Sequence, residues 1–290
     1  MLEACRVNSA RHYDAVARAW GYLLGSSLHY GYFESGGESL EHATGSLTAR
    51  MLERLRGIGP GTRVLDVGCG TGAPAQALAR RLGCAVAGIS PSTACIDIAR
   101  ATVPGDLAGL LHFELGDAQA MAFADQSFEA AWVMESSHLM LDKRRLFTEL
   151  RRVLKPGGQV VLCDVVQTRE LALAEVIARR DEFLLLARVF GRALMRPPAL
   201  YASQARSAGF DQVEMLDLTA ATAPTFVRWR ANAATHRDTV VRLIGEPAWA
   251  DFVAATHVLE SLWSEQVLGY FLLTATSLFA RRTPCKSTSR

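Results

Sequence analysis

Three glycines at alternate positions, Gly68, Gly70 and Gly72, follow directly after a short apolar run that contains Asp66. The run reads VLDV, which is typical of a buried strand, and an amphipathic segment at 75–82 begins after a proline and ends at a glycine. The pattern therefore predicts a strand, a tight turn and a helix. Glycines let a ligand approach the backbone, and a helix start offers free N–H groups. The turn is predicted to bind a nucleoside-like cofactor.

The position of the acidic residue indicates which cofactor. Gly68-x-Gly70-x-x-Ala73 also fits the dinucleotide fingerprint, but that fingerprint requires a second acid about 20 residues later. Here the second predicted strand, 85–89, ends in Ser90 and has no carboxylate. Asp66 beside the glycines repels a pyrophosphate and attracts an ammonium group. A ligand with an amino-acid end and an adenosine end fits both features, and S-adenosylmethionine (SAM) is such a ligand.

Strands and helices alternate through the first half of the chain, which predicts an α/β fold with a parallel, doubly wound sheet. Helices are expected at 13–24 and 47–55, before the alternation begins. After residue 165 the alternation stops, and a long apolar helix is expected at 170–195. Further helices at 226–244 and 249–268 and strands at 213–218 and 272–279 complete the prediction.

Composition excludes several classes of protein. The 290 residues carry a net charge of +2 without a long basic run, so no nucleic-acid partner is expected. Six cysteines lack metal-ligand spacing, which favours reduced thiols, no metal site and a cytoplasmic location. The N-terminal residues show no apolar signal core, and the longest apolar runs are too short to span a bilayer.

Six short motifs together resemble those of the class I SAM-dependent methyltransferases. They are VLDVGCGTG at 64–72, GDAQ at 116–119, LRRVLKPGG at 150–158, LHYGYF at 28–33, GIS at 88–90 and ESSHLM at 135–140. They are most similar to the small-molecule branch that includes the rebeccamycin sugar O-methyltransferase and the tocopherol methyltransferases. The terpenoid C-methyltransferases, such as the teleocidin-pathway enzyme, are plausible neighbours. The resemblance covers roughly residues 13–164, about half of the chain.

The resemblance implies a Rossmann-like class I methyltransferase fold, with a seven-stranded, mostly parallel sheet and a helical cap. We expect an N-terminal helical lid at 1–56 and a SAM-binding core at 57–165. A helical cap insertion is expected at 166–210. Residues 211–290 are expected to complete the core, with the helices at 222–268 contributing to the cap. Such lids often exchange between subunits, so a homo-oligomer is expected.

The resemblance also implies the cofactor-binding residues. Asp66 would hold the methionine ammonium, Ser90 would replace the acid that binds the ribose hydroxyls, and Asp117 would accept from the adenine amino group. The full expected set is Asp66, Gly68, Gly70, Gly72, Ser90, Gly116, Asp117, Ala118, Glu135, Tyr13 and Tyr30. Ordinary roles remain open, because Asp66 and Asp117 are also residue types that cap helices and form turns, and the tyrosines could simply pack.

His138 is the candidate general base, since related enzymes use a histidine here and an aspartate matching Asp164 to take the acceptor's proton. Histidine suits this task because it titrates near neutral pH. Many relatives have a second histidine where this chain has Leu139. A structural histidine and a capping aspartate remain the alternatives.

The apolar stretch at 183–195 predicts a greasy acceptor pocket, and therefore a small hydrophobic specialised metabolite as substrate. Burial of the same stretch on two sides as core is the plainer alternative. Whether an oxygen or a carbon is methylated is left open. A sugar O-methyltransferase, a protein of this fold that catalyses cyclisation, and an NAD-dependent oxidoreductase are the competing hypotheses.

Overall fold

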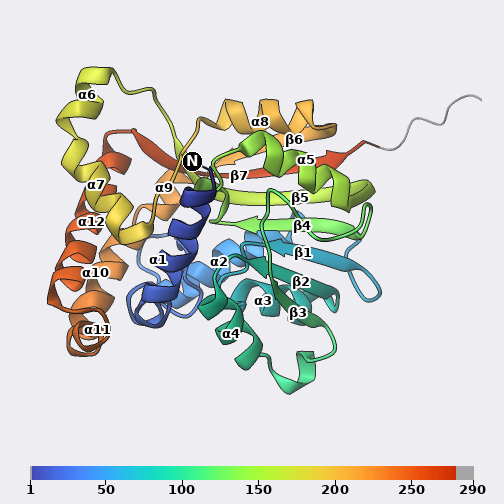
Figure 1. Cartoon of the computed structure of the whole chain (residues 1–290), viewed down its shortest axis with the longest axis horizontal. Coiled ribbons are helices and arrows are strands. Elements are labelled where there is room, and N and C mark those ends of the chain that lie inside the picture. The colour runs from blue at the N-terminus through green and yellow to red at the C-terminus, as the bar shows by residue number, and fades with distance from the viewer. Residues whose placement is uncertain (1, 279–290) are drawn as a thin grey trace, which may run out of the picture.

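The computed structural model describes residues 2–278, with side chains from residue 12 onward. One seven-stranded sheet carries both the predicted cofactor site and the predicted general base (Figure 1). The strand order is β3-β2-β1-β4-β5-β7-β6. The strands are β1 (Arg63–Val67), β2 (Ala85–Ser90), β3 (Leu111–Leu115), β4 (Phe128–Met134), β5 (Leu154–Gln167), β6 (Phe210–Asp217) and β7 (Leu268–Ser277). All neighbours are parallel except β7, which runs antiparallel to β5 and β6. The predicted fold class is confirmed.

Helices cover both faces of the sheet and gather beyond its carboxyl edge (Figure 1). Those that belong to the sheet layers are α2 (Leu40–Leu52), α3 (Ala73–Leu82), α4 (Thr93–Ala101), α5 (Lys143–Val153) and α8 (Pro198–Ser207). The others are α1 (Leu2–Leu23), α6 (Leu173–Ala178), α7 (Arg180–Phe190), α9 (Thr219–Thr222), α10 (Thr225–Thr235), α11 (Arg237–Ile244) and α12 (Glu246–Ser264). Two single 3₁₀ turns, η1 (Gly105–Leu107) and η2 (Ser137–Leu139), complete the elements.

The two acids that matter most lie on opposite faces of the sheet. Successive side chains of a strand point to opposite sides. Asp66 pairs in register with Trp132, which belongs to the core beneath α2 and α3. Asp164 pairs with Phe271, which belongs to the other core, beneath α5 and α8. Both acids come at or near the carboxyl ends of their strands, where open α/β sheets bind ligands.

The helical cap differs in detail from the predicted elements. The long helix expected at 170–195 is instead two helices, because the chain breaks at Arg179 between α6 and α7. The helix expected at 226–244 also breaks, at His236. The last strand begins at Leu268, four residues before its expected start, and its expected last residue, Phe279, lies outside the described residues.

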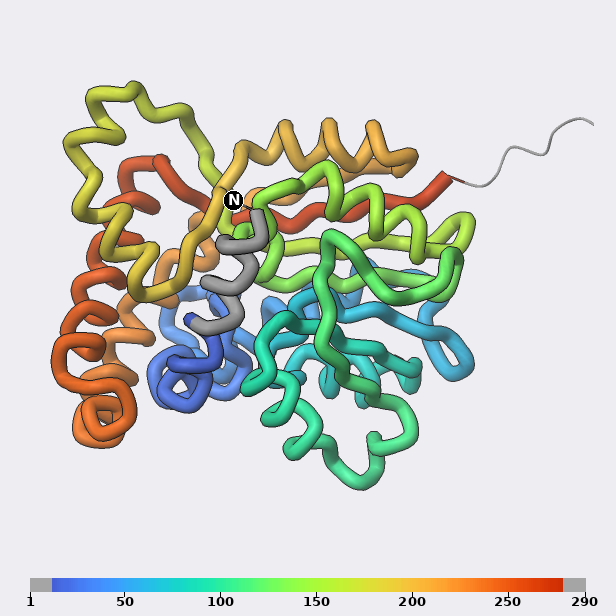
Figure 2. Tube along the Cα trace, in the orientation of Figure 1, coloured from blue at the N-terminus to red at the C-terminus, as the bar shows by residue number. Residues whose placement is uncertain are grey.

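Helices from distant parts of the chain pack together in the cap. Figure 2 shows α7 beside α12, and the Arg188 guanidinium of α7 pairs with Asp251 of α12 at 2.6 Å. Helix α1 also contacts α10 and α11. Across residues 2–278, no helix is both long and apolar enough to cross a membrane. The predicted domain boundaries stay predictions, and residues 1 and 279–290 of the outer two segments lie outside the described residues.

Candidate cofactor and acceptor sites

The glycine turn joins β1 to α3. Each of its three positions requires glycine for a different structural reason. A Cβ at Gly68 would come 2.3 Å from the Cβ of Ser136, and one at Gly72 would come 2.9 Å from the Phe113 ring. These two glycines are therefore required by packing within the protein itself. A Cβ at Gly70 would meet nothing within 4 Å, although its φ of +51° disfavours any side chain. Gly70 is the glycine whose bare backbone faces open space.

Replacing Gly70 with alanine is expected to weaken binding of S-adenosylhomocysteine (SAH) at least tenfold, because the new methyl group occupies that space. Gly57→Ala is the matched control, since Gly57 also has a positive φ (+68°) and open surroundings but lies before β1. Both variants should lose about 1 kcal/mol of stability from the left-handed backbone. Calorimetric titration checks the difference, and equal SAH affinities in the two variants would contradict the assignment of Gly70.

The Asp66 carboxyl is buried without compensation by the described residues. Its exposed fraction is 1 %, and its Oδ2 has no hydrogen-bond partner among them. Burial raises the pKa of Asp66 to about 7. Its charge also helps to raise the pKa of the buried Cys69 thiol, after burial itself, so the carboxyl lies near the turn. A buried carboxylate of this kind is stabilised by a ligand cation, which fits the ammonium of SAM.

Two further predicted contacts lie at the ends of neighbouring strands. Ser90 is buried at the end of β2, and its Oγ accepts from the Ser92 N–H at 3.2 Å. Asp117 follows β3, and its Oδ1 accepts from the Gln119 N–H at 2.9 Å, which makes a turn. A Cβ at Gly116 would lie 3.0 Å from Ile89, so packing explains that glycine, while Ala118 is buried beside it. Their contacts with adenosine stay predictions.

Helix α1 is tied directly to the cofactor side of the sheet. The Asp14 carboxylate accepts from the Ser92 hydroxyl at 2.5 Å and from the Ala94 N–H at 3.1 Å, so it caps the start of α4. This contact was missed in the sequence, because nothing local pairs residues 14 and 92. It holds Tyr13 over the carboxyl edge of the sheet.

Two cavities meet at this edge. The smaller, about 90 Å³, is lined by the turn residues Gly68–Thr71 and by His29 and Cys95. The larger, about 260 Å³, is lined mainly by apolar side chains of the cap, including Phe183, Leu186, Phe190, Met195, Trp229 and Leu259. Tyr13, Trp20, Leu28 and Glu135 line both. A ligand in one cavity therefore lies against a ligand in the other, as transfer between a cofactor and an acceptor requires.

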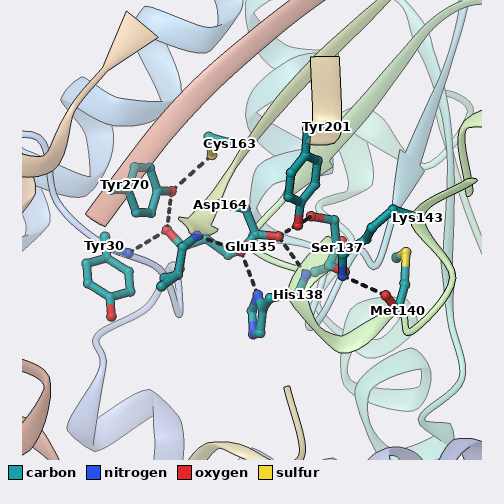
Figure 3. Close-up of polar contacts among 12 residues, drawn as sticks. Tyr30, Glu135, Ser137, His138, Met140, Lys143, Cys163, Asp164, Tyr201 and Tyr270 are labelled. Carbon is teal, nitrogen blue, oxygen red and sulfur yellow. Dashed lines mark hydrogen bonds and ion pairs between the residues drawn. The ribbon is translucent and has the colours of Figure 1, made fainter. Parts of the chain in front are cut away.

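A hydrogen-bonded pair, His138 and Asp164, borders the larger cavity (Figure 3). The ring Nδ1 of His138 lies 2.6 Å from Asp164 Oδ1, and the His138 backbone N–H donates to Asp164 Oδ2 at 2.8 Å. Burial alone would raise the pKa of Asp164, but His138, Ser137 and Lys143 outweigh it and hold that pKa below its ordinary value. The ionised carboxylate only accepts, so the proton in this contact is on Nδ1, and Nε2 is the ring nitrogen left free of Asp164.

Glu135 joins the N-terminal segment to the sheet (Figure 3). Its Oε1 accepts from the Tyr30 N–H at 2.9 Å and from the Tyr270 hydroxyl at 2.5 Å. Burial raises the pKa of Glu135 to about 8, against the effect of these two hydrogen bonds. The Tyr30 ring stacks on Trp263 at a centroid distance of 5.5 Å, and it lines only the larger cavity. The predicted cofactor contact of Tyr30 thus has less support than that of Tyr13.

Several residues of the site had no recognisable signal in the sequence. Ser137, Lys143 and Tyr201 surround Asp164 from the α5 and α8 side, and Tyr270 reaches Glu135 from β7.

Within the described residues, no group of His, Cys, Asp and Glu side chains is arranged to hold a metal ion. Cys69, Cys84, Cys95 and Cys163 are free thiols; the side chain of Cys5 and all of Cys285 lie outside the described residues.

Comparisons with known proteins agree with this geometry. A family model described as "Methyltransferase domain" matches residues 65–162. The chain is 32% identical over 269 residues to the 27-O-demethylrifamycin SV methyltransferase of Amycolatopsis mediterranei, which covers 91% of this chain and 94% of the relative. It is 32% identical over 212 residues to the (+)-O-methylkolavelool synthase of Herpetosiphon aurantiacus, covering 72% of each.

A solved structure, that of the [4+2]-cyclase SpnF, is similar over nearly the whole chain. The TM-score is 0.79 at 29% sequence identity, and the match covers 93% of this chain and 95% of the other. This similarity extends through the cap as well as the sheet.

Proposed function

Because this chain belongs to the class I SAM-dependent methyltransferases, we propose that it methylates a hydroxyl oxygen of an apolar small molecule. The observation that carries the proposal is the His138–Asp164 pair at the wall of an apolar cavity that adjoins the glycine-turn cavity. The first relative's printed name, which specifies an O-demethyl acceptor, supports oxygen rather than carbon.

The cofactor is SAM, and the residues present fit it: Gly70, with its open backbone, lines the small cavity, and Asp66, whose Oδ2 has no partner among the described residues, lies near the same turn. When bound, SAM supplies an electrophilic methyl group on a sulfonium. Tyr13 and Glu135 lie where the two cavities meet, so they border the path between methyl and acceptor. Asp66, Gly70 and Tyr13 would bind and orient the cofactor, and the apolar cap would exclude water.

His138 would remove the proton from the acceptor hydroxyl. Its Nε2 accepts this proton while Asp164 holds Nδ1–H and stabilises the resulting imidazolium. Alignment of the oxygen with the methyl carbon supplies much of the remaining acceleration. Leu139 in place of a second polar residue agrees with an acceptor that is apolar around its hydroxyl.

The chemistry of the cavity argues against a sugar acceptor. Apart from His138 and Glu135 at the sheet edge, and Tyr13 and Tyr30, its lining is apolar. A sugar ring would leave several hydroxyls without partners there, at about 1–3 kcal/mol each.

Methyl-labelled SAM and pairs of acceptors test the proposal. Each pair comprises a polycyclic or prenylated alcohol or phenol and its glycoside, and mass spectrometry identifies the methylated atom. We expect O-methyl ethers from the apolar members only. Transfer to the sugar hydroxyls, or to carbon of an acceptor already O-methylated, would overturn the assignment.

Ala187 of α7 provides a test of where the acceptor binds, because it lines the larger cavity and not the smaller. Ala187→Phe fills space in the cap, and overpacking of this kind is worth about 1–3 kcal/mol. We expect KM for a polycyclic acceptor to rise about tenfold or more, with SAH affinity unchanged. A smaller acceptor from the same panel is the internal control. An unchanged KM for both would place the acceptor elsewhere.

Cyclisation is the second candidate, favoured by the similarity to a [4+2]-cyclase across the cap. Such a reaction needs an enclosed apolar cavity and no transferred group. In the same experiment it would appear as an isomer of unchanged mass, formed equally well by His138→Ala. Assembly as a homo-oligomer and a cytoplasmic location remain predictions from the sequence.

A further inference from the structure

A buried ammonium group lies beside the turn that carries His138 (Figure 3). Lys143 is the first residue of α5, and only 4 % of it is exposed. Its Nζ donates to the carbonyl oxygen of Met140 at 2.6 Å and also to that of Ser137. These two carbonyls belong to the first residue of η2, the 3₁₀ turn in which His138 lies, and to the residue that follows this turn. Lys143 therefore joins the beginning of this turn to the residue after it through two hydrogen bonds.

The same ammonium lies in the surroundings of Asp164. Ser137 donates its hydroxyl to Asp164 Oδ2, and the Ser137 Oγ lies 3.1 Å from the Tyr201 hydroxyl. Lys143 Nζ lies 5.7 Å from the centroid of the Tyr201 ring. Its charge lowers the pKa of Asp164, along with the larger effects of His138 and Ser137 and against burial. Lys143 forms no ion pair with any carboxylate of the described residues, so its charge acts on this site through space.

A buried cation without a direct carboxylate partner is unfavourable for stability. Among the side chains that the structure describes, Lys143 is the only lysine or arginine that is buried. Only three of the chain's 31 basic residues are lysines, and Lys155 is exposed in an ion pair with Glu129 while Lys286 lies outside the described residues. The lysine at 143 thus places a compact charge where an arginine fork would need more space. A function at the neighbouring site accounts for this placement.

We propose that Lys143 is a positioning residue for the His138–Asp164 pair: it fixes the turn that carries the ring, and its charge opposes protonation of that ring. This inference rests on the proposed role of His138 as base. A positive charge near an imidazole disfavours the imidazolium, so removing the charge of Lys143 is expected to make protonation of the ring easier. Burial lowers the pKa of Lys143 to about 8, although Asp164 acts in the opposite direction.

Other ionisable groups face the pair from each neighbouring element and stay in place when Lys143 is changed. They are Glu135 after β4, Cys163 on β5, Tyr13 on α1, Tyr30 before α2, Tyr201 on α8 and Arg196 before α8. Any difference between wild type and a Lys143 variant therefore reports the lysine itself.

The test follows the His138 ring by ¹⁵N NMR across a pH titration, with His138→Gln used to assign its signals. In Lys143→Met, which keeps the length and removes the charge, the titration midpoint should rise by about 0.5 to 1 pH unit. On the acidic side of the profile, kcat for the acceptor found above should then fall about three- to tenfold, since each pH unit is a factor of ten. SAH affinity should stay within about twofold, because Lys143 borders neither cavity.

Lys155→Met is the matched control, and neither readout should change in it. If Lys143→Met does not fold, Lys143→Gln decides the question, because its amide can still donate to the two carbonyls but carries no charge: it should shift the midpoint as well. A folded neutral variant with the wild-type midpoint and kcat profile overturns the proposal. If no acceptor is methylated, the proposed function fails, but the ring titration still decides the role of Lys143.

Discussion

His138→Ala is expected to lower kcat for methyl transfer by about 100- to 10,000-fold, the range that a positioned general base contributes. The variant loses the only ring nitrogen that the Asp164 pair presents to the larger cavity. SAH affinity should be unchanged, because His138 does not line the smaller cavity. Initial rates with a saturating apolar acceptor and calorimetric titration of SAH provide the two measurements.

His112→Ala is the control for this variant. His112 is on β3, with its side chain 69 % exposed and its ring Nε2 3.4 Å from Glu114, so its loss should leave kcat within error. Asp164→Asn should also lower kcat strongly, since it disturbs the tautomer of His138 as well as its position. A parallel fall of SAH affinity and kcat in His138→Ala would show that the histidine only supports the fold of the η2 turn.

Asp66→Asn is expected to weaken SAH binding by about 1–3 kcal/mol, or roughly 5- to 150-fold, because the ligand ammonium loses a buried charged partner. The amide has nearly the same shape, so the glycine turn should keep its geometry. Wild-type affinity should also rise with pH through about 7, as the carboxyl loses its proton. The variant should lack this pH dependence. Titrations between pH 6 and pH 8 check both statements, and a wild-type affinity independent of pH would count against a carboxylate–ammonium contact.

The same carboxyl makes a prediction about stability without ligand. Because burial raises the pKa of Asp66 in the folded chain, the folded state holds its proton more tightly than the unfolded state. Stability of the ligand-free protein should therefore fall as the pH rises from about 4 to about 7. Asp66→Asn removes this loss, so the ligand-free variant should have a higher Tm than wild type at pH 8. Scanning calorimetry at pH 5 and pH 8 provides the comparison.

Much of the sheet and its cofactor edge could be predicted from local patterns. Nearly continuous apolar runs at 64–67 and 128–134 indicate strands that are buried on both faces, and the glycine turn marks where the first strand ends. His138 and Asp164 could be placed near one another because His138 follows β4 and Asp164 lies near the carboxyl end of the adjacent strand, β5. Local sequence patterns therefore predicted correctly where these residues lie along the strands and at which edge of the sheet.

Long-range contacts were not predictable in this way. Asp14 on Ser92, Tyr201 beside Ser137 and Tyr270 on Glu135 join residues 64 or more positions apart, with no periodicity that relates them. The breaks at Arg179 and His236 carry no glycine or proline at the junction. Gly68 and Gly72 illustrate a further limit: their neighbours Ser136 and Phe113 explain the missing side chain, which the sequence alone assigned to a ligand.

The placement of Asp66 and Asp164 on opposite faces of one sheet has an evolutionary consequence. With the roles proposed above, substitutions under α5 and α8 would change proton removal more than cofactor binding, and substitutions around the glycine turn would do the reverse. Evolution could thus change the acceptor while the residues on the cofactor-binding side of the sheet stay the same. A designer wishing to redirect this enzyme should vary the cap and the α5–α8 side, and leave the other side alone.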